Sequence, residues 1–417
     1  MEKWIWAERG ITGDSSTVLS PAWVGIRDGI ISYVDQKEPD PVPEVNVTRL
    51  LNATLTPGLM NLHDHISRKF LRNNTLGLAF GVVSKMFMAE DSHYLLLHSV
   101  HNAGDALKHG VTFIRDYGLA GLTSIHLRRA IAEGLIEGPE ISACGQPICM
   151  TGGHTHRQAC EADGESAVRE AVRRQLKHGA DVIKFMASGG LEHFPEEDPY
   201  RTELTESEMR VGVEVARSAD VPTAAHAYPS SAISNALRAG VDSIEHGVQL
   251  TDECIELMCK AEVALVPTVS GLRTASLAGR SGDEFKQFRE QLWNRILYPQ
   301  EESIRRAIKA GVLVGTGTDS GGDLVREIRL LAEIAGETPT EALSRATGVA
   351  SRIAKRPDLG LLEVGRKAHL VAFAGDLTKS LDCLEQVMQV WYEGRPILEN
   401  PSDAPPRVAY GSGAVVK

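Results

Sequence analysis

Cysteine is scarce in this sequence, and its spacing excludes the common uses of paired cysteines. Six cysteines occur among 417 residues, and they form no C-x-x-C pair and no disulfide-dense pattern. Disulfides persist mainly in oxidising compartments. We therefore expect reduced thiols in a cytoplasmic protein.

Long apolar runs and an excess of positive charge are also lacking. No window approaches the ~18 uncharged apolar residues that a membrane helix requires, and the N-terminal MEKWIWAERGITGD has no basic segment followed by an apolar one. We expect neither a membrane span nor a signal peptide. Lys and Arg number 44 against 55 Asp and Glu, a net charge of −11, which argues against a nucleic-acid partner.

Low-complexity tracts and repeats of solenoid period are absent as well. The 42% hydrophobic and 24% charged residues are instead typical of a globular chain. A chain of 417 residues exceeds one typical domain of ~100–200 residues, unless its fold is a large α/β barrel.

Short apolar runs alternate with longer amphipathic segments from about residue 55 onwards. Several amphipathic segments end in glycine just before the next apolar run, as left-handed helix caps do; examples are Gly110, Gly179, Gly240 and Gly311. This rhythm predicts an α/β fold, a TIM-like (β/α)8 barrel, with an open doubly wound sheet as the alternative. The predicted strands are 58–65, 111–117, 141–147, 181–187, 222–228, 242–247, 264–270 and 313–320.

Both ends of the chain have strand-like sequences. Residues 24–34 have the pattern of two short strands joined at Asp28-Gly29, which is a hairpin signal, and strand-like runs return after residue 365. The simplest arrangement is one small domain made by both termini. The predicted domains are a small β-sandwich of residues 1–55 plus 361–417 and a barrel of residues 56–360.

The first predicted barrel strand ends in a pair of histidines. Residues i and i+2 of a strand point to the same side, so His63 and His65 can reach one metal ion while Asp64 points away. A single His-x-His pattern is weak evidence, because ordinary surfaces also carry it.

Other strands carry chemically active residues near the same end. Lys184 ends the apolar fourth strand, where a charged amine is costly to bury. His226, His246 and Asp319 lie at the ends of the fifth, sixth and eighth strands. Because the C-terminal ends of barrel strands face the active site, the whole set predicts a catalytic metal site at this rim.

Together with their flanking motifs, these residues resemble the amidohydrolase superfamily of metal-dependent hydrolases. The resemblance covers nearly the whole chain. Because it has a lysine on the fourth strand, the chain resembles the binuclear members of the superfamily. In those members this lysine is carboxylated and bridges two metals. The matching motifs are TPGLMNLHDH at 56–65, Lys184, His226, His246, Gly317-Thr318-Asp319 and G-x-L-E-x-G-x-x-A at 360–368.

The resemblance implies two divalent metal ions and an N6-carboxylated Lys184. Zinc is the expected metal, since imidazole and carboxylate ligands suit it, while manganese, iron and cobalt stay open. Asp319 would orient a metal-bridging hydroxide, accept its proton as general base and pass that proton to the leaving amine. The implied ligands are His63, His65 and Asp319 for the more buried metal and His226 and His246 for the more exposed one.

Three further motifs, at 142–154, 183–190 and 224–228, resemble the branch of prolidases, Xaa-Arg/Lys dipeptidases and ochratoxin-hydrolysing amidases. That branch cleaves an amide beside a free carboxylate, so the implied substrate is a dipeptide or an N-acyl amino acid. His154 and Tyr228 would contact it, with Tyr228 donating a hydrogen bond to the carbonyl oxygen. An ordinary loop residue after a Gly-Gly turn is an equal alternative for His154.

Several questions stay open at the level of sequence. The same scaffold could hydrolyse a cyclic amide or carbamate, or deaminate a ring, and a barrel without chemistry could be a binding protein, although such relatives typically lose the ligands kept here. A substrate carboxylate requires a cation, for which Arg68, Arg157 and Arg201 are candidates by position. The segment 66–100 is a candidate lid. A homo-oligomer is compatible with the resemblance.

Overall fold

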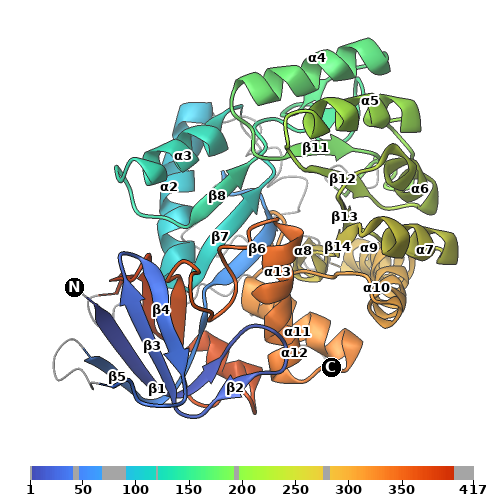
Figure 1. The fold of residues 1–417 in the computed structure, drawn as a ribbon. Helices are drawn as coiled ribbons and strands as arrows, with labels where there is room; N and C mark the ends of the chain where they lie inside the picture. Colours follow the sequence, from blue (N-terminus) through green and yellow to red (C-terminus); the bar gives the residue numbers. More distant parts are fainter. Residues whose placement is uncertain are drawn as a thin grey trace.

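The computed structural model describes residues 2–40, 47–67, 91–118, 121–191, 197–275 and 282–398. Arg68 and most of the candidate lid at 66–100 lie outside these residues. Within them, the chain forms a barrel of parallel strands surrounded by helices, and a separate β-sheet packs at one side of it (Figure 1).

Parallel strands of the barrel form two hydrogen-bonded sheets, one of order β6-β7-β8 and one of order β10-β9-β11-β12-β13-β14. The Asp181 N–H donates to Ala143 O at 2.8 Å and joins the end of the first sheet to the segment before β11. The strands are β6 (Leu59–Asp64), β7 (Val111–Asp116), β8 (Glu140–Ala143), β9 (Ile148–Cys149), β10 (Cys160–Glu161), β11 (Ile183–Met186), β12 (Thr223–Ala227), β13 (Ser243–His246) and β14 (Ala264–Val266).

The first seven barrel strands are β6, β7, β8, β11, β12, β13 and β14, while β9 and β10 are two-residue strands beside β11. The eighth is a short segment that closes the ring. Val314 pairs in parallel with Leu265 of β14. On the other side, the Leu62 N–H of β6 donates to Thr316 O at 2.9 Å. The first and last strands are therefore neighbours, which confirms the predicted (β/α)8 barrel and rules out the open doubly wound sheet.

Helices alternate with the strands and cover the outside of the barrel (Figure 1). Gly110, Gly179, Gly240 and Gly311 have φ of 86°, 87°, 89° and 89°, so the predicted left-handed ends are confirmed. The helices are α2 (Ser92–Lys108), α3 (Thr123–Ala132), α4 (Gly164–Lys177), α5 (Glu206–Arg217), α6 (Ser230–Ala239), α7 (Asp252–Ala261), α8 (Val269–Ala275), α9 (Gly282–Leu292), the π-helix η1 (Trp293–Leu297), α10 (Tyr298–Ala310), α11 (Leu324–Ala335), α12 (Pro339–Arg345), α13 (Gly348–Ile353) and the 3-10 helix η2 (Leu381–Glu385).

The seventh strand is shorter than the predicted 264–270. It ends at Val266, and α8 begins at Val269. The backbone N–H groups of Val269 and Ser270 donate to the buried carboxylate of Glu327 at 3.0 and 2.6 Å. This carboxylate comes from α11, and it satisfies the first donors of α8 so that a helix starts where the apolar pattern suggested a strand.

Strands from both termini form one sheet of order β17-β16-β15-β5-β1-β3-β4, with β2 paired to β1. The predicted hairpin is confirmed, since Asp28 and Gly29 have φ of 52° and 80° between β3 and β4. The N-terminal and C-terminal strands meet where Leu55 lies opposite Ala372. The strands are β1 (Lys3–Ile11), β2 (Val18–Leu19), β3 (Ala22–Arg27), β4 (Ile30–Asp35), β5 (Val47–Pro57), β15 (Leu370–Ala374), β16 (Val387–Tyr392) and β17 (Arg395–Pro396).

The terminal sheet encloses a core of its own. Ile5 of β1 belongs to the same buried cluster as Leu370 of β15 and Trp391 of β16. The N-terminal and C-terminal strands therefore share one interior, as in the predicted β-sandwich. The predicted domain boundary at residue 55 stays a prediction. β5 crosses this position and continues without a break to Pro57.

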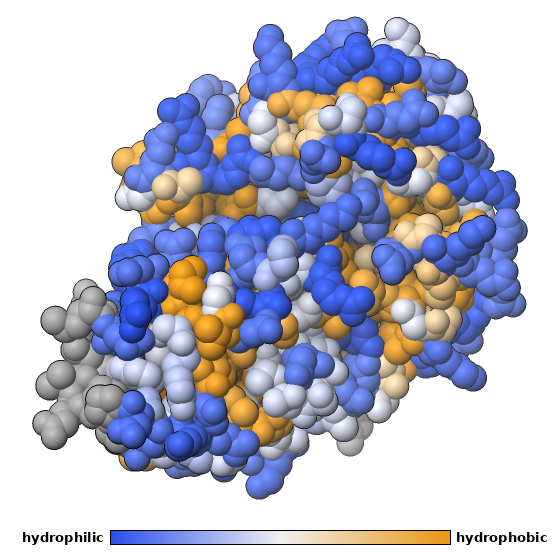
Figure 2. All heavy atoms as spheres, viewed as in Figure 1, coloured by the Kyte–Doolittle hydropathy of each residue, from blue (hydrophilic) through white to orange (hydrophobic). Residues whose placement is uncertain are grey.

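Apolar packing between strands and helices supports the barrel from outside. In α4, for example, Val168 and Val172 are fully buried, while hydrophilic side chains cover the outer surface of this helix (Figure 2). The barrel interior is thus left to the side chains that the strands direct inward. None of the described helices is both long enough and apolar enough to cross a membrane.

Candidate metal centre

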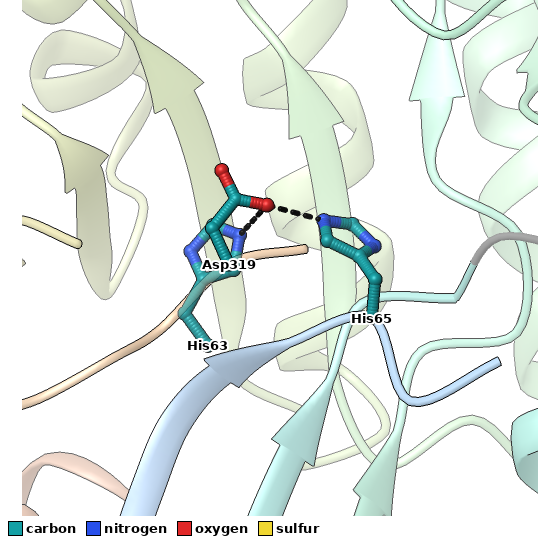
Figure 3. Close-up of side chains that lie close together, drawn as sticks. All are labelled: His63, His65 and Asp319. Atoms are coloured by element: carbon teal, nitrogen blue, oxygen red, sulfur yellow. Dashed lines mark ion pairs between the residues drawn. The ribbon is translucent and has the colours of Figure 1, made fainter. Parts of the chain in front are cut away.

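Asp319 lies between the two histidines that end β6. Its Oδ1 is 3.3 Å from His65 Nε2 and 3.9 Å from His63 Nε2 (Figure 3). One ligand atom from each residue lies within 4.8 Å of the others, as in a three-residue metal site. The first and last strands place this group, because the backbone N–H groups of Thr318 and Asp319 both donate to His63 O, at 2.8 and 2.9 Å.

His226 and His246 complete a cluster of imidazole rings. The His246 ring centroid is 5.0 Å from that of His63 and 4.6 Å from that of His226. His246 Nδ1 lies 2.7 Å from Thr268 Oγ1, and His226 Nε2 lies 2.9 Å from Gly189 O. Each ring is therefore fixed through one nitrogen, and the other nitrogen is the one that can bind a metal.

His63 has the protonation state and the open nitrogen of a metal ligand. Burial, assisted by the charge of Lys184, lowers the pKa of His63 to about 4, so the imidazole is neutral at pH 7. Its Nδ1 lies 2.7 Å from Glu245 Oε2. Its Nε2 is buried and has no hydrogen-bond partner in the part of the chain that the structure describes. A neutral imidazole with an unused buried nitrogen fits a divalent metal.

Lys184 is buried beside these rings, with 1% of its surface exposed. Its Nζ lies 4.0 Å from the ring centroid of Tyr117. Burial lowers the pKa of Lys184 to about 8, against the opposing charges of Glu245 and Asp319. A sizeable fraction of the amine is therefore neutral near pH 8, which is the form that can react with carbon dioxide.

Asp319 stays ionised although it is partly buried, with 25% of its side chain exposed. Burial alone would raise its pKa, but the hydrogen bond from His65 and the charges of the neighbouring histidines hold the pKa well below its ordinary value. The carboxylate can therefore bind a cation or accept a proton at neutral pH. Asp319 also has a positive φ of 55°, which turns the chain sharply at the end of the last strand.

His154 and Tyr228 both pack against the candidate ligands. The ring of His154 stacks on that of His226 with centroids 4.4 Å apart, and Tyr228 lies 4.8 Å from His226 and 5.1 Å from His246. Burial raises the pKa of Tyr228 well above its ordinary value, so its hydroxyl keeps a proton to donate. Both predicted substrate residues are thus brought to the same group as the predicted ligands.

Glu197 and Glu203 hold His154 from two sides. Glu197 Oε1 lies 2.7 Å from His154 Nδ1, and Glu203 Oε2 accepts from the His154 backbone N–H at 2.8 Å. Arg201 donates to the other oxygen of Glu203 at 2.7 Å. Arg201 therefore supports the loop of His154, and its role as a candidate for binding the substrate carboxylate stays a prediction. Arg157 is exposed in the turn that follows His154.

Sequence reasoning missed the polar residues that surround the predicted ligands. Arg115 and Glu245 are buried charged residues inside apolar strands, which is the same signal that singled out Lys184. Glu245 also precedes His246 directly. Tyr117 and Glu197 gave no comparable signal, because neither residue type is unusual at the end of a strand or in a loop.

Comparison with known proteins adds independent information. The sequence model of the amidohydrolase family matches residues 54–398. The chain is 28% identical over 440 residues to an ochratoxinase of Aspergillus niger, covering 96% of this chain and 87% of that protein. The crystal structure of a Xaa-Pro dipeptidase with bound methionine superposes with a TM-score of 0.83 and 26% identity, covering 95% of this chain and 99% of the other.

A second solved structure is similar to the same extent. A prolidase complexed with N-methylphosphonate-L-proline superposes with a TM-score of 0.82 and 27% identity. The similarity covers 95% of this chain and 99% of the prolidase chain. The likeness therefore includes the barrel and the terminal sheet together.

Proposed function

We propose, from the premise that this chain belongs to the amidohydrolase family and hydrolyses amide or peptide bonds, that its substrate is a dipeptide or an N-acyl amino acid with a free carboxylate. The similar proteins support this choice. One of them is crystallised with methionine and another with an N-phosphonylated proline, and both ligands carry a carboxylate one carbon away from a nitrogen.

The observation that carries the proposal is that side chains of the types that bind metals lie together at the C-terminal end of the barrel strands. His63, His65 and Asp319 form a compact group, and the buried rings of His226 and His246 adjoin it. This donor set suits two divalent cations, with zinc as the expected metal. When bound, the metals would polarise the amide carbonyl and activate a water molecule.

The residues of the chain divide the metal binding and the chemistry between them. His63, His65 and Asp319 would hold one metal, His226 and His246 the other, and Lys184 would bridge them once it is carboxylated. Asp319, ionised in the folded protein, would accept a proton from the attacking water and deliver it to the leaving amine. Tyr228 would donate its hydroxyl hydrogen to the amide oxygen, and His154 would contact the substrate beside it.

The bridging role of Lys184 is tested by metal content together with activity. We expect two metals in the wild-type chain, and at most one in Lys184→Ala with a rate reduced by at least ~10²-fold, because the second metal would lose an anionic ligand. Lys379→Ala is the matched control, because this lysine is 80% exposed. Two metals and a normal rate in Lys184→Ala would contradict the bridging role.

The substrate class is tested by comparing N-acyl amino acids and dipeptides with their C-terminal amides. We expect the amidated compounds to react at least ~10²-fold more slowly in kcat/KM, because they lack the charge that the site would recognise. Cyclic amides and carbamates complete the panel. Preferential hydrolysis of cyclic compounds would contradict the proposed substrate while leaving the metal site intact.

A further inference from the structure

Glu245 is a fully buried carboxylate that the proposed mechanism does not use. It lies on β13 directly before His246, and none of its surface is exposed. An ionised carboxylate in such a place is costly unless its oxygens are fully hydrogen-bonded. Its partners therefore indicate what the residue does.

The two carboxylate oxygens of Glu245 have different hydrogen-bond partners. Oε1 accepts three hydrogen bonds: from Arg115 Nη2 at 3.1 Å, the Tyr117 hydroxyl at 3.0 Å and Ser243 Oγ at 2.7 Å. Among the residues that the structure describes, Oε2 has one partner, His63 Nδ1, at 2.7 Å. Three donors on one oxygen fix the carboxylate in place and direct the other oxygen at His63.

The hydrogen-bond geometry of Glu245 indicates which nitrogen of His63 carries the hydrogen. Arg115, Tyr117 and Ser243 all donate to Oε1, and the Arg115 guanidinium forms a buried ion pair with this carboxylate. A carboxylate can only accept, so His63 Nδ1 must be the donor. The lone pair is then on Nε2, the buried nitrogen without a hydrogen-bond partner among the described residues, on the side of Asp319.

We propose that Glu245 is a positioning residue of the metal site, which fixes the ring and the tautomer of His63 so that Nε2 can bind the metal. This inference rests on the proposed metal-dependent function. The geometry does not make Glu245 itself a ligand, because Oε1 accepts three hydrogen bonds and Oε2 faces His63 Nδ1. Turning it towards a metal would leave the buried guanidinium of Arg115 without its carboxylate.

The partners of Glu245 also contact the strand of His63 and the side chain of Lys184. Arg115 also donates through Nε to Leu62 O at 2.7 Å, one residue before His63. Tyr117 meets the His63 ring edge to face at 4.7 Å, and its ring also contacts Lys184 Nζ. The strands β6, β7, β11 and β13 are therefore joined around one carboxylate.

The inference is tested by measuring zinc affinity, without reference to turnover. Metal-free wild type and Glu245→Gln would be titrated with Zn²⁺ against a chromophoric chelator. The amide keeps the size of the side chain but removes its charge and one acceptor oxygen. We expect the affinity for the first zinc ion to fall by ~10–100-fold, as is usual when the partner of a metal-binding histidine is removed.

A double-mutant cycle separates positioning from direct binding. If Glu245 acts through His63, then adding Glu245→Gln to His63→Ala should weaken zinc binding no further. Independent weakening by each substitution would contradict the inference. Wild-type affinity in the Glu245→Gln single variant would contradict it too, whereas a wild-type protein that binds no zinc would contradict the proposed function instead.

Two further variants keep the test decisive if Glu245→Gln does not fold. Ser243→Ala and Tyr117→Phe each remove one donor to Oε1 and leave the carboxylate in place, so each should weaken zinc binding several-fold. Unchanged affinity in both would contradict the inference. Glu140→Gln is the matched control, because this partly buried carboxylate binds Arg356 and His369 at the opposite end of the barrel. Its zinc affinity should equal that of the wild type.

Discussion

Burial and neighbouring charges together set the charges at the candidate metal centre, and their balance differs from residue to residue. Burial lowers the pKa of His63 to about 4 and that of Lys184 to about 8, which favours the neutral forms of two bases. Asp319 behaves differently, because the hydrogen bond from His65 and the neighbouring charges outweigh its burial. Neutral nitrogen donors beside an ionised carboxylate are the combination that a divalent cation binds.

At the residue scale, Tyr228→Phe tests the role of the buried hydroxyl beside His226 and His246. We expect kcat to fall by ~10²-fold with little change in KM, because a hydrogen bond to the developing oxyanion would be lost only in the transition state. Steady-state kinetics on an N-acyl amino acid measures this. Tyr298→Phe is the control, because Tyr298 is 57% exposed. An unchanged kcat in Tyr228→Phe would remove Tyr228 from the mechanism.

The candidate ligands could be predicted from the sequence because residue type and strand position both point to them. His63, Lys184 and Asp319 each lie at the end of an apolar run, and a barrel brings such ends together. Glu245 and Arg115 escaped prediction because their meaning depends on partners from distant strands. Hydrogen bonds between residues more than 100 positions apart leave no local pattern.

At the scale of elements, the turn after β11 is tightly packed against the site. Gly189 O accepts the hydrogen bond of His226 Nε2, and Gly190 N–H donates to Glu197 at 2.8 Å. A Cβ at Gly190 would lie 2.2 Å from His154 Cε1. This turn therefore sets the positions of a candidate ligand and a candidate substrate residue together.

Gly190→Ala should displace His154 from its stack on His226. We expect kcat/KM to fall by ~10–100-fold, because a shift of about 1 Å in a positioned group has effects of this size. Gly104→Ala is the matched control, because Gly104 lies within α2 and a Cβ there would meet nothing within 4 Å. It should keep full activity and gain roughly 0.5–1 kcal/mol in the free energy of unfolding. Normal kcat/KM in Gly190→Ala would show that the contact is unimportant.

Elements with their own local signals were predicted well, and elements defined by distant contacts were not. Glycine at the left-handed helix ends and Asp28-Gly29 in the hairpin were visible in the sequence. The start of α8 was not, because the carboxylate that satisfies its first N–H groups belongs to Glu327 in α11.

At the scale of the whole molecule, a group of charges joins the barrel to the terminal sheet. Glu140, the first residue of β8, accepts from Arg356 at 2.6 Å, Lys367 at 2.7 Å and His369 at 2.8 Å. His369 precedes β15 directly. The group lies at the N-terminal end of the barrel strands, opposite the candidate metal centre, so it serves the connection between the two parts.

Glu140→Gln should destabilise the fold by about 2–4 kcal/mol at pH 7, because Arg356 and Lys367 would lose their carboxylate and His369 would lose its acceptor. Burial alone would raise the pKa of Glu140, but His369 and Lys367 hold it far below its ordinary value of 4.5. The stabilisation is therefore present above pH 4.5 and is lost as the pH falls below it. Urea unfolding of both proteins at several pH values measures the difference, which should shrink in acid. A difference that does not depend on pH would contradict this account.

The meeting of the first and last barrel strands has a consequence for how the protein is made. His63 and His65 leave the ribosome long before Asp319, which their site requires and which is hydrogen-bonded to the His63 backbone. A growing chain that stops short of residue 319 holds only two of the three ligands. A metal ion that requires all three ligands would therefore bind only after residue 319 has been made and the first and last strands have met.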